Sequence, residues 1–256
     1  MKRAGAALTM LVAPLLMGQA KPELVPDVSQ RNIEIAYSFT GAELLLFGAI
    51  LYPNGRIPGP EERPADIVVV VKGPTEAIQV REKEKVAGIW VNAQTMRYRS
   101  APSFYAIASS RPVRAILDER TRAIFELGLD SLQLSPASGA APEVQQRFDR
   151  GLVDLRVRNG LFYEAPGAVE ITDGVLYRAR LAIPARVPVG RFTAETFLIR
   201  DGRVLAAAVR PIDIRKSGFE RFVATSAERY SLAYGVVAVA LSVLFGWGAG
   251  AIWRRI

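Results

Sequence analysis

An uncharged apolar run near the C-terminus is the feature that most constrains this chain. Ser231–Trp253 spans 23 residues without one charged side chain and consists largely of Val, Leu, Ala and Gly. Roughly 20 such residues are enough for a helix to cross the hydrocarbon core of a bilayer. The buried helix of a soluble protein, the alternative interpretation, would not be expected to have the flanks described next. The run therefore predicts one transmembrane helix.

The residues that flank this run are of the kinds that membrane interfaces favour. Tyr230 and Tyr234 lie at its start and Trp253 lies at its end, and the rings of Tyr and Trp are enriched in the headgroup zone. Arg254 and Arg255 follow at once, and basic residues beside a span mark its cytoplasmic side. We expect these five residues to anchor the helix, with residues 254–256 as a cytoplasmic tail.

A glycine pair inside the apolar run favours contact with another helix. Gly246 and Gly250 have the Gly-x-x-x-Gly spacing, which removes side chains from one face and lets a second helix approach closely. Ordinary composition is the alternative explanation, since Gly is common in membrane helices. If the pair is used, its partner is either a multi-spanning membrane protein or a second copy of this chain.

The first 20 residues have the parts of a secretory signal peptide. Lys2 and Arg3 form a charged start, residues 4–17 are mostly apolar, and Ala20 ends the small-residue cleavage region. An uncleaved anchor is the alternative, but about 14 apolar residues are too few to cross a bilayer. We expect cleavage after Ala20 and a single-pass protein of the bacterial inner membrane, with its N-terminus in the periplasm and its C-terminus in the cytoplasm.

The residue inventory excludes several kinds of chemistry. The chain has no Cys and no His, so it lacks disulfides, thiol nucleophiles and the commonest ligand for zinc and haem iron. Its formal charge is +8, but the basic residues are scattered singly, whereas a nucleic-acid groove needs a basic stripe with aromatic residues between. We expect no cofactor, no metal, no nucleic-acid partner and no enzyme activity.

The segment between the two apolar ends has the patterns of β-strands. Residues 33–39 alternate with a period of two, and residues 67–71 form a β-branched run typical of a buried central strand. Asp173-Gly174 and Asp201-Gly202 each separate two further strand-like runs, and Asp-Gly is a strong hairpin signal. These patterns predict a mainly β body.

Two features are predicted within residues 75–110. Trp90 and Phe104 lie in short strand-like runs, and we expect both aromatic rings in the core. Residues 81–85 read Arg-Glu-Lys-Glu-Lys, which favours a charged hairpin tip or the protection of a sheet edge over a recognition site.

The period of the pattern changes after Pro112. Apolar residues in Pro142–Arg158 recur at spacings of three and four, which predicts an amphipathic helix packed on the sheet. We expect Arg147, Arg150 and Arg156 to face water.

The fold prediction combines these elements. We expect one antiparallel, Ig-like β-sandwich over residues 21–216 with a helical insertion at about residues 111–158. A connector at residues 217–230 and the transmembrane helix at residues 231–253 follow. Two separate small β domains are the alternative arrangement.

Carboxylate pairs offer one candidate for catalysis. Asp118 with Glu119, or Asp149 with Asp154, contain the groups that an acid–base hydrolase uses. Their spacing does not favour that chemistry, because solvated helix faces carry such residues routinely. We therefore assign no catalytic residue.

A group of basic residues before the apolar run is a candidate anion site. Arg210, Arg215, Lys216 and Arg221 could hold sulfite or a sulfonate by charge-assisted hydrogen bonds. The alternative is surface charge beside anionic lipid headgroups.

Several short stretches of the chain resemble a family of putative transmembrane proteins of alpha-proteobacteria. The stretches are Phe39-Thr40-Gly41 with residues 45–48, Val71-Lys72-Gly73-Pro74, Gly88-Ile89-Trp90, Gly160-Leu161-Phe162-Tyr163-Glu164, Leu176-Tyr177-Arg178-Ala179, Leu181-Ala182-Ile183-Pro184 with Pro188-Val189-Gly190, Tyr234-Gly235 and the closing residues 247–255. The resemblance extends from about residue 24 to the end of the chain. It implies a membrane-anchored periplasmic protein, with no assigned activity and no catalytic residues to carry over.

The resemblance also suggests an accessory role beside a permease of the sulfite or organosulfonate exporter type. We therefore expect a membrane-anchored periplasmic accessory or interaction module. A small-anion-binding periplasmic domain is the alternative function.

Overall fold

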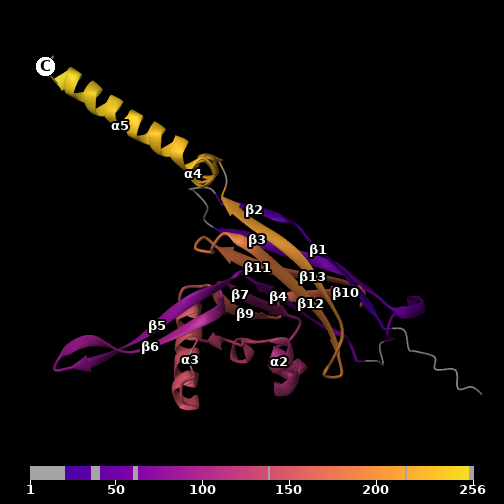
Figure 1. The fold of residues 1–256 in the computed structure, drawn as a ribbon. Helices are drawn as coiled ribbons and strands as arrows, with labels where there is room; N and C mark the ends of the chain where they lie inside the picture. Colours follow the sequence, from indigo (N-terminus) through magenta and orange to yellow (C-terminus); the bar gives the residue numbers. More distant parts are fainter. Residues whose placement is uncertain (1–20, 36–40, 60–62, 138, 217, 254–256) are drawn as a thin grey trace, which may run out of the picture.

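The computed structural model describes residues 21–35, 41–59, 63–137, 139–216 and 218–253. The predicted signal peptide, the second half of the strand predicted at residues 33–39, and the tail residues Arg254 and Arg255 lie outside the described residues. A β-rich body of three sheets and several helices leads into two C-terminal helices (Figure 1).

The first sheet has four antiparallel strands in the order β1, β3, β11, β10. Successive residues alternate between its two faces, so that in β11 Tyr177, Ala179 and Leu181 are buried between exposed neighbours. Asp173 and Gly174 link β10 to β11 with φ of 53° and 66°, which confirms the turn expected at Asp-Gly. The strands are β1 Glu23–Val28, β3 Gly41–Leu51, β10 Val169–Thr172 and β11 Leu176–Pro184.

The second sheet has six strands in the order β2, β13, β12, β4, β7, β9. Its central strand, β4, contains the predicted β-branched run, and residues 67–71 are each 0% exposed. Asp201 and Gly202 join β12 to β13, as predicted, with φ of 50° and 73°. The strands are β2 Asn32–Ile35, β4 Asp66–Lys72, β7 Tyr105–Ser109, β9 Phe162–Pro166, β12 Gly190–Arg200 and β13 Arg203–Lys216.

The fold is mainly β with a C-terminal apolar helix, as predicted, but the expected Ig-like antiparallel sandwich is not what the strand order gives. The pairs β2–β13 and β7–β9 run parallel. A parallel pair needs a long crossover connection, and the helical segment between β7 and β9 supplies one. The segment is therefore a crossover and not the insertion predicted from the sequence, because periodicity does not show strand direction.

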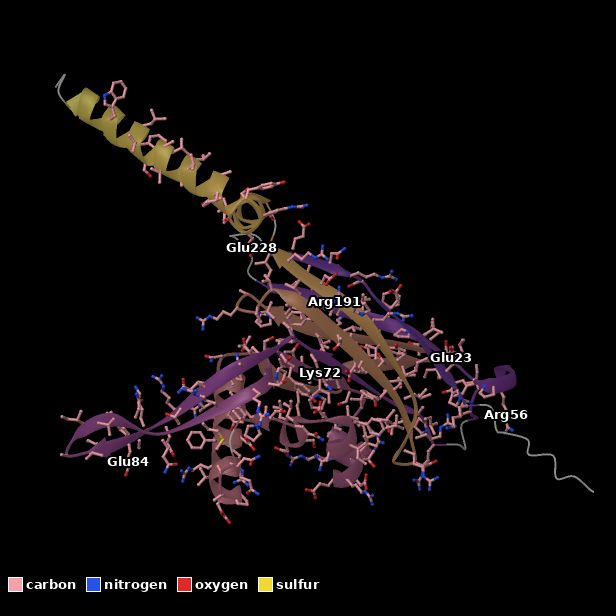
Figure 2. All side chains as sticks on the ribbon, viewed as in Figure 1. Glu23, Arg56, Lys72, Glu84, Arg191 and Glu228 are labelled. Carbon is pink, nitrogen blue, oxygen red and sulfur yellow. The ribbon has the colours of Figure 1, made fainter. Side chains whose placement is uncertain are left out.

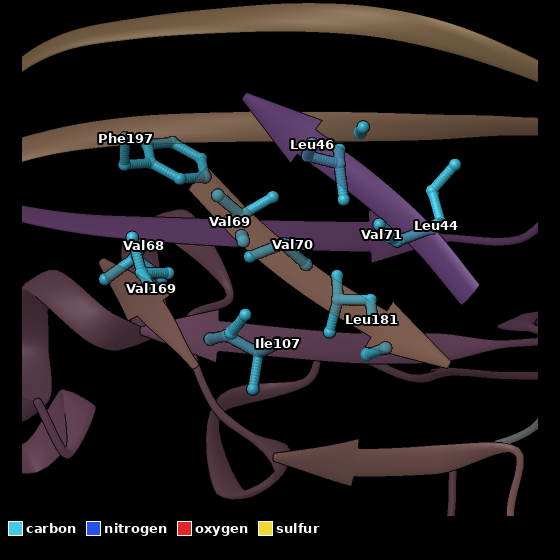
Figure 3. Packing of buried hydrophobic residues seen from close by; sticks show 14 of the residues in the cluster. Leu44, Leu46, Val68, Val69, Val70, Val71, Ile107, Val169, Leu181 and Phe197 are labelled. Atoms are coloured by element: carbon cyan, nitrogen blue, oxygen red, sulfur yellow. The ribbon is translucent and has the colours of Figure 1, made fainter. Parts of the chain in front are cut away.

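The two large sheets share one hydrophobic core. Figure 3 shows Leu44, Leu46 and Leu181 of the four-stranded sheet close to the valines of β4. Strands from the two halves of the chain also pair directly, β3 with β11 and β4 with β12. Phe104, predicted to be a core aromatic, is 0% exposed.

A third sheet, β5 Thr75–Val86, β6 Ile89–Pro102 and β8 Ser135–Pro136, packs with helix α3. The helix spans Pro142–Arg158, as predicted, and its Phe148 and Leu152 form a small second core with Met96 and Tyr98. Tyr98 also donates a hydrogen bond to Asp149 Oδ1 at 2.7 Å.

The outward direction predicted for the α3 arginines is correct only in part. Arg147 is half exposed, and Arg150 is exposed. Arg156 is a correction, because its side chain is only 12% exposed and pairs with Glu76 of β5. The apolar stem of an Arg side chain can pack on apolar surface, and helical periodicity alone does not predict this burial of Arg156.

Strands β5 and β6 extend beyond α3 as a two-stranded ribbon, here called the arm (Figure 1). Trp90 lies at its tip and is 65% exposed, so the prediction that it is a core residue is wrong. Residues 81–85 continue β5 toward the tip, and the turn itself is Ala87-Gly88, with φ of 49° and 87°. A short strand-like run does not distinguish a core strand from a protruding ribbon.

In Figure 1, helices α2 and α3 lie at the lower face of the body, and α4 and α5 follow at the C-terminal end of the chain. In Figure 1, α4 is seen end-on while α5 is seen from the side and leads away from the body. The remaining helical elements are η1 Pro53–Gly55, α1 Val113–Ile116, α2 Glu119–Phe125, η2 Leu129–Ser131, α4 Gly218–Arg229 and α5 Ser231–Trp253.

Gly48 allows β1 and β11 to approach β3 closely, which generates a stability prediction. A Cβ at this position would lie 2.6 Å from Tyr177 Oη and 2.9 Å from Pro26 Cα, and closer still to the Val25 carbonyl oxygen. We expect Gly48→Ala to lower the free energy of unfolding by about 2 kcal/mol, since backbone atoms must move. Urea unfolding of the full chain in mild detergent measures this.

Gly151→Ala is the matched control for this prediction. Gly151 lies inside α3, where a Cβ meets no described atom within 4 Å, so the substitution should stabilise by about 0.5–1 kcal/mol through helix propensity. Equal unfolding midpoints for the two variants would contradict the account of Gly48.

Candidate functional site

Helix α5 is the one helix of the described residues long and apolar enough to span a membrane. Residues Ser231–Gly250 have a mean hydropathy of 1.9, and none of this span is buried against the rest of the chain. The body therefore gives α5 no apolar cover, which a soluble protein would need.

The predicted flanking residues lie at the two ends of this helix. Tyr230 and Tyr234 are at the end nearest the body, 62% and 39% exposed, and the Tyr234 amide donates to the Tyr230 carbonyl at 2.8 Å. Trp253 is the last residue of α5. Arg254 and Arg255 lie outside the described residues.

A row of small residues runs along α5 at intervals of four. It consists of Ala238, Ser242, Gly246 and Gly250, and it contains the predicted glycine pair. The Ser242 hydroxyl donates to the Ala238 carbonyl at 2.8 Å, so its polar group is satisfied within the helix. A Cβ added at Gly246 would meet open space in the described part of the chain.

The outer face of the four-stranded sheet is the second apolar surface, here called the outer sheet face. It comprises Val25, Phe47, Leu51 and Leu176, each between 40% and 56% exposed. A shallow groove of about 500 Å³ lies on it. Strand register places Phe47 opposite Asp27 on one side and Arg178 on the other, so charged groups border the apolar area. Such a bordered patch is typical of protein contact surfaces.

Lys72, Glu126 and Glu195 form a cluster of charges in the body. Lys72 Nζ lies 3.0 Å from Glu126 Oε2 and 3.3 Å from Glu195 Oε2. The three side chains are between 20% and 30% exposed. They line a groove of about 370 Å³ together with Phe125 and Phe197, and Figure 2 shows Lys72 within the body.

Backbone geometry next to this cluster is held by a buried tyrosine. Tyr105 is 0% exposed, and its hydroxyl donates to the Glu126 carbonyl at 2.7 Å and accepts from the Gly128 amide at 3.0 Å. Burial raises the pKa of Tyr105, so the hydroxyl stays protonated. The contact stabilises the left-handed conformation of Glu126, with φ of 53°, which ends α2.

The charge cluster joins separate elements of the body. Lys72 is on β4, Glu195 is on β12, and Glu126 follows α2, so the two ion pairs tie the helix to the sheet. No group of three or more metal-ligating side chains lies within the described ranges.

The predicted carboxylate pairs have local structural roles. Asp118 caps α2 by accepting from the Thr121 amide at 3.0 Å, and hydrogen bonds from Thr121 lower its pKa. Glu119 lies in the first turn of the same helix. Asp149 accepts from Tyr98, whereas Asp154 pairs with Arg158 at 2.8 Å on the exposed side of α3.

The predicted anion site is not assembled by the side chains that the structure describes. Arg210 Nε donates to the Pro26 carbonyl at 2.9 Å, and Arg215 binds Asp213 at 3.0 Å. Strand alternation puts the two arginines on opposite faces of β13. The side chains of Lys216 and Arg221 lie outside the described set.

Neither the Lys72 cluster nor the exposed tip of the arm is predicted from the sequence. Lys72 ends an apolar strand, but its partners are far away in the chain and only the pairing of β4 with β12 brings Glu195 beside it. Trp90 carried a usable signal, because Lys83, Glu84 and Lys85 precede it so closely. A core hairpin would not be expected to carry these charges.

Comparison with known proteins gives one match over nearly the whole chain. A family model described as "Putative transmembrane protein (Alph_Pro_TM)" matches residues 23–255. No curated protein matches the chain.

Replacing Lys72 tests the structural role of the charge cluster. We expect Lys72→Met to lower the free energy of unfolding by about 1–3 kcal/mol, because two partly buried carboxylates then lack a counter-ion. Urea unfolding of the full chain in mild detergent measures the loss.

A charge-free cluster provides the control. Lys72→Met combined with Glu126→Gln and Glu195→Gln should recover most of the stability, since no unpaired charge remains. A triple variant as unstable as Lys72→Met alone would show that Lys72 acts through packing instead.

Proposed function

This chain belongs to the Alph_Pro_TM family of putative transmembrane proteins, and on that basis we propose that it is a membrane-anchored accessory module that binds another membrane protein. The observation that carries the proposal is α5, an apolar helix of membrane length that the body leaves entirely uncovered. In a bilayer, lipid or another helix covers such a surface.

The small-residue row of α5 supports contact with a second helix. Gly246 and Gly250, preceded by Ser242 and Ala238, leave one side of the helix almost flat. Close approach of helices at such rows gains dispersion contacts that bulkier side chains prevent. A multi-spanning permease, of the sulfite or organosulfonate exporter type, is the partner that we propose, and self-association through α5 is the alternative.

The proposed location is the bacterial inner membrane, with the β-rich body in the periplasm. The signal-peptide features of residues 1–20 and the basic pair Arg254 and Arg255 support this orientation. The outer sheet face then lies outside the membrane, where it can contact the periplasmic part of the same partner. Its apolar centre and charged border suit a protein surface.

A non-enzymatic role agrees with how the body uses its charges. Asp118, Asp149 and Asp154 are engaged in a helix cap, a hydrogen bond and an ion pair. Arg210 and Arg215, invoked for small-anion binding, contact the body itself. Contact with a partner therefore has more support than catalysis or anion binding.

Affinity purification from native membranes tests the proposal. A tag inserted after Lys21 stays on the chain if the signal peptide is cleaved after Ala20, and mild detergent followed by mass spectrometry identifies what accompanies it. We expect one multi-spanning protein in comparable amount, with recovery about tenfold lower for Gly246→Leu combined with Gly250→Leu, because bulky side chains block close packing.

Gly248→Leu is the matched control, since helical rotation places residue 248 opposite the midpoint of Gly246 and Gly250. It should leave the partner's recovery unchanged. A chain that purifies alone, or a partner retained equally by all variants, would contradict the proposed role of α5.

A further inference from the structure

The arm is held to the body only at its base, among the described residues. Ile78 and Val80 of β5 pack with α3 through the second core. Farther toward the tip, the last contact between α3 and the arm is made by Arg147, which binds Glu82 at 3.0 Å and Gln94 at 2.8 Å. Beyond this clamp the ribbon runs on to the turn at Ala87-Gly88, and Figure 2 shows Glu84 close to the tip, well away from Lys72 in the body.

The tip of the arm exposes an unusual amount of apolar surface. Val86, Ile89, Trp90 and Val91 are 53%, 68%, 65% and 41% exposed. Single exposed apolar residues are common on protein surfaces, but four residues around one turn form an exposed hydrophobic patch. An isolated two-stranded ribbon also gains little from folding on its own. The tip therefore has the composition of a contact surface.

The two faces of the tip differ in chemistry. Strand pairing puts Val86 opposite Ile89 at the turn, with Val91 and the opposite Glu84 farther along the same face. The other face carries Lys85 opposite Trp90, with Lys83 next along the strand. Trp prefers the headgroup zone of a bilayer, and Lys covers apolar surface with its stem while its ammonium reaches lipid phosphate. The combination matches a membrane interface better than a dry protein contact, where Lys is depleted.

The placement of the arm relative to α5 points to the same surface. Helix α4 joins the body to α5, and it ends at Arg229, one residue before α5 begins at Ser231. In Figure 1, the arm and α5 both extend away from the β-rich body, toward the left of the view. The tip thus lies away from the body on the side toward which α5 leads.

We propose that the tip of the arm, Val86 to Val91 with Lys83 and Lys85, inserts into the surface of the bilayer that α5 crosses. The ligand is the lipid surface itself: apolar side chains enter the boundary of the acyl chains, and the two lysines bind anionic headgroups. The tip alone has a low affinity for the bilayer, but α5 keeps it beside the membrane at a high effective concentration. This inference rests on membrane anchoring by α5 and does not depend on a protein partner.

Fluorescence of Trp90 in vesicles that contain only this chain and lipid tests the inference. Trp247→Phe with Trp253→Phe leaves Trp90 as the one tryptophan of the three in the sequence. In vesicles of phosphatidylcholine and anionic phosphatidylglycerol, we expect Trp90 to emit at a shorter wavelength than a tryptophan that is exposed to water. Brominated acyl chains should quench it about twofold or more, because the ring lies at the acyl boundary.

Two variants in the same background sharpen the result. Moving the reporter to the outer sheet face, by Trp90→Phe with Phe47→Trp, should abolish the quenching, since β3 belongs to the four-stranded sheet of the body and not to the arm. Ile89→Glu should reduce the quenching of Trp90, because a carboxylate at the tip opposes insertion. Ile89 is 68% exposed, so this change leaves the packing of the body intact.

Equal Trp90 emission in brominated and ordinary vesicles would overturn the proposal. Emission that shifts to shorter wavelength only in native membranes would assign the tip to a protein partner and would also overturn it. Because the vesicles contain no partner, neither result depends on whether the permease interaction exists.

Discussion

The burial of strand β4 is the constraint on which the rest of the body depends. Residues 67–71 are completely buried, and successive side chains of a strand point to opposite faces, so both faces of the six-stranded sheet need cover. The four-stranded sheet covers one face with Leu44, Leu46 and Leu181. The segment between β7 and β9 returns across the other and adds Val113, Ile116 and Leu127 to the same core. One apolar run thus dictates a layered body and a long crossover connection.

The crossover connection also explains the arm. Once the chain between β7 and β9 must cross the sheet, it has room for α3, and the apolar side of α3 needs its own cover. The base of the β5–β6 ribbon supplies that cover with Met96 and Tyr98. The ribbon is longer than α3 requires, and its surplus length carries the exposed Trp90. The exposed end of the arm therefore follows from the need of α3 for cover at the base of the arm.

Local patterns in the sequence predicted local structure well, and long-range arrangement poorly. The Asp-Gly turns, the central strand at residues 67–71, helix Pro142–Arg158 and the apolar helix Ser231–Trp253 each depend on residues close together in the chain. Parallel pairing of β7 with β9, and the joining of Lys72 to Glu195, depend on which strands become neighbours, and no short pattern encodes that. The prediction that Trp90 lies in the core is wrong for a third reason. Apolar character marks any surface that avoids water, including one that contacts lipid or a partner.

The distribution of charge and apolar surface agrees with the proposed role in protein contacts. In a ligand-binding domain, a few polar groups converge within a largely apolar cavity, whereas here Asp66, Glu126 and Asp149 bind neighbours within the body. Apolar side chains remain outside on α5, the outer sheet face and the arm. A body held by one helix alone can turn about that helix and tilt, and a partner must then restrict this motion when it binds. Contact of the arm with the bilayer would restrict it beforehand, so that the outer sheet face keeps one orientation toward a neighbour in the membrane.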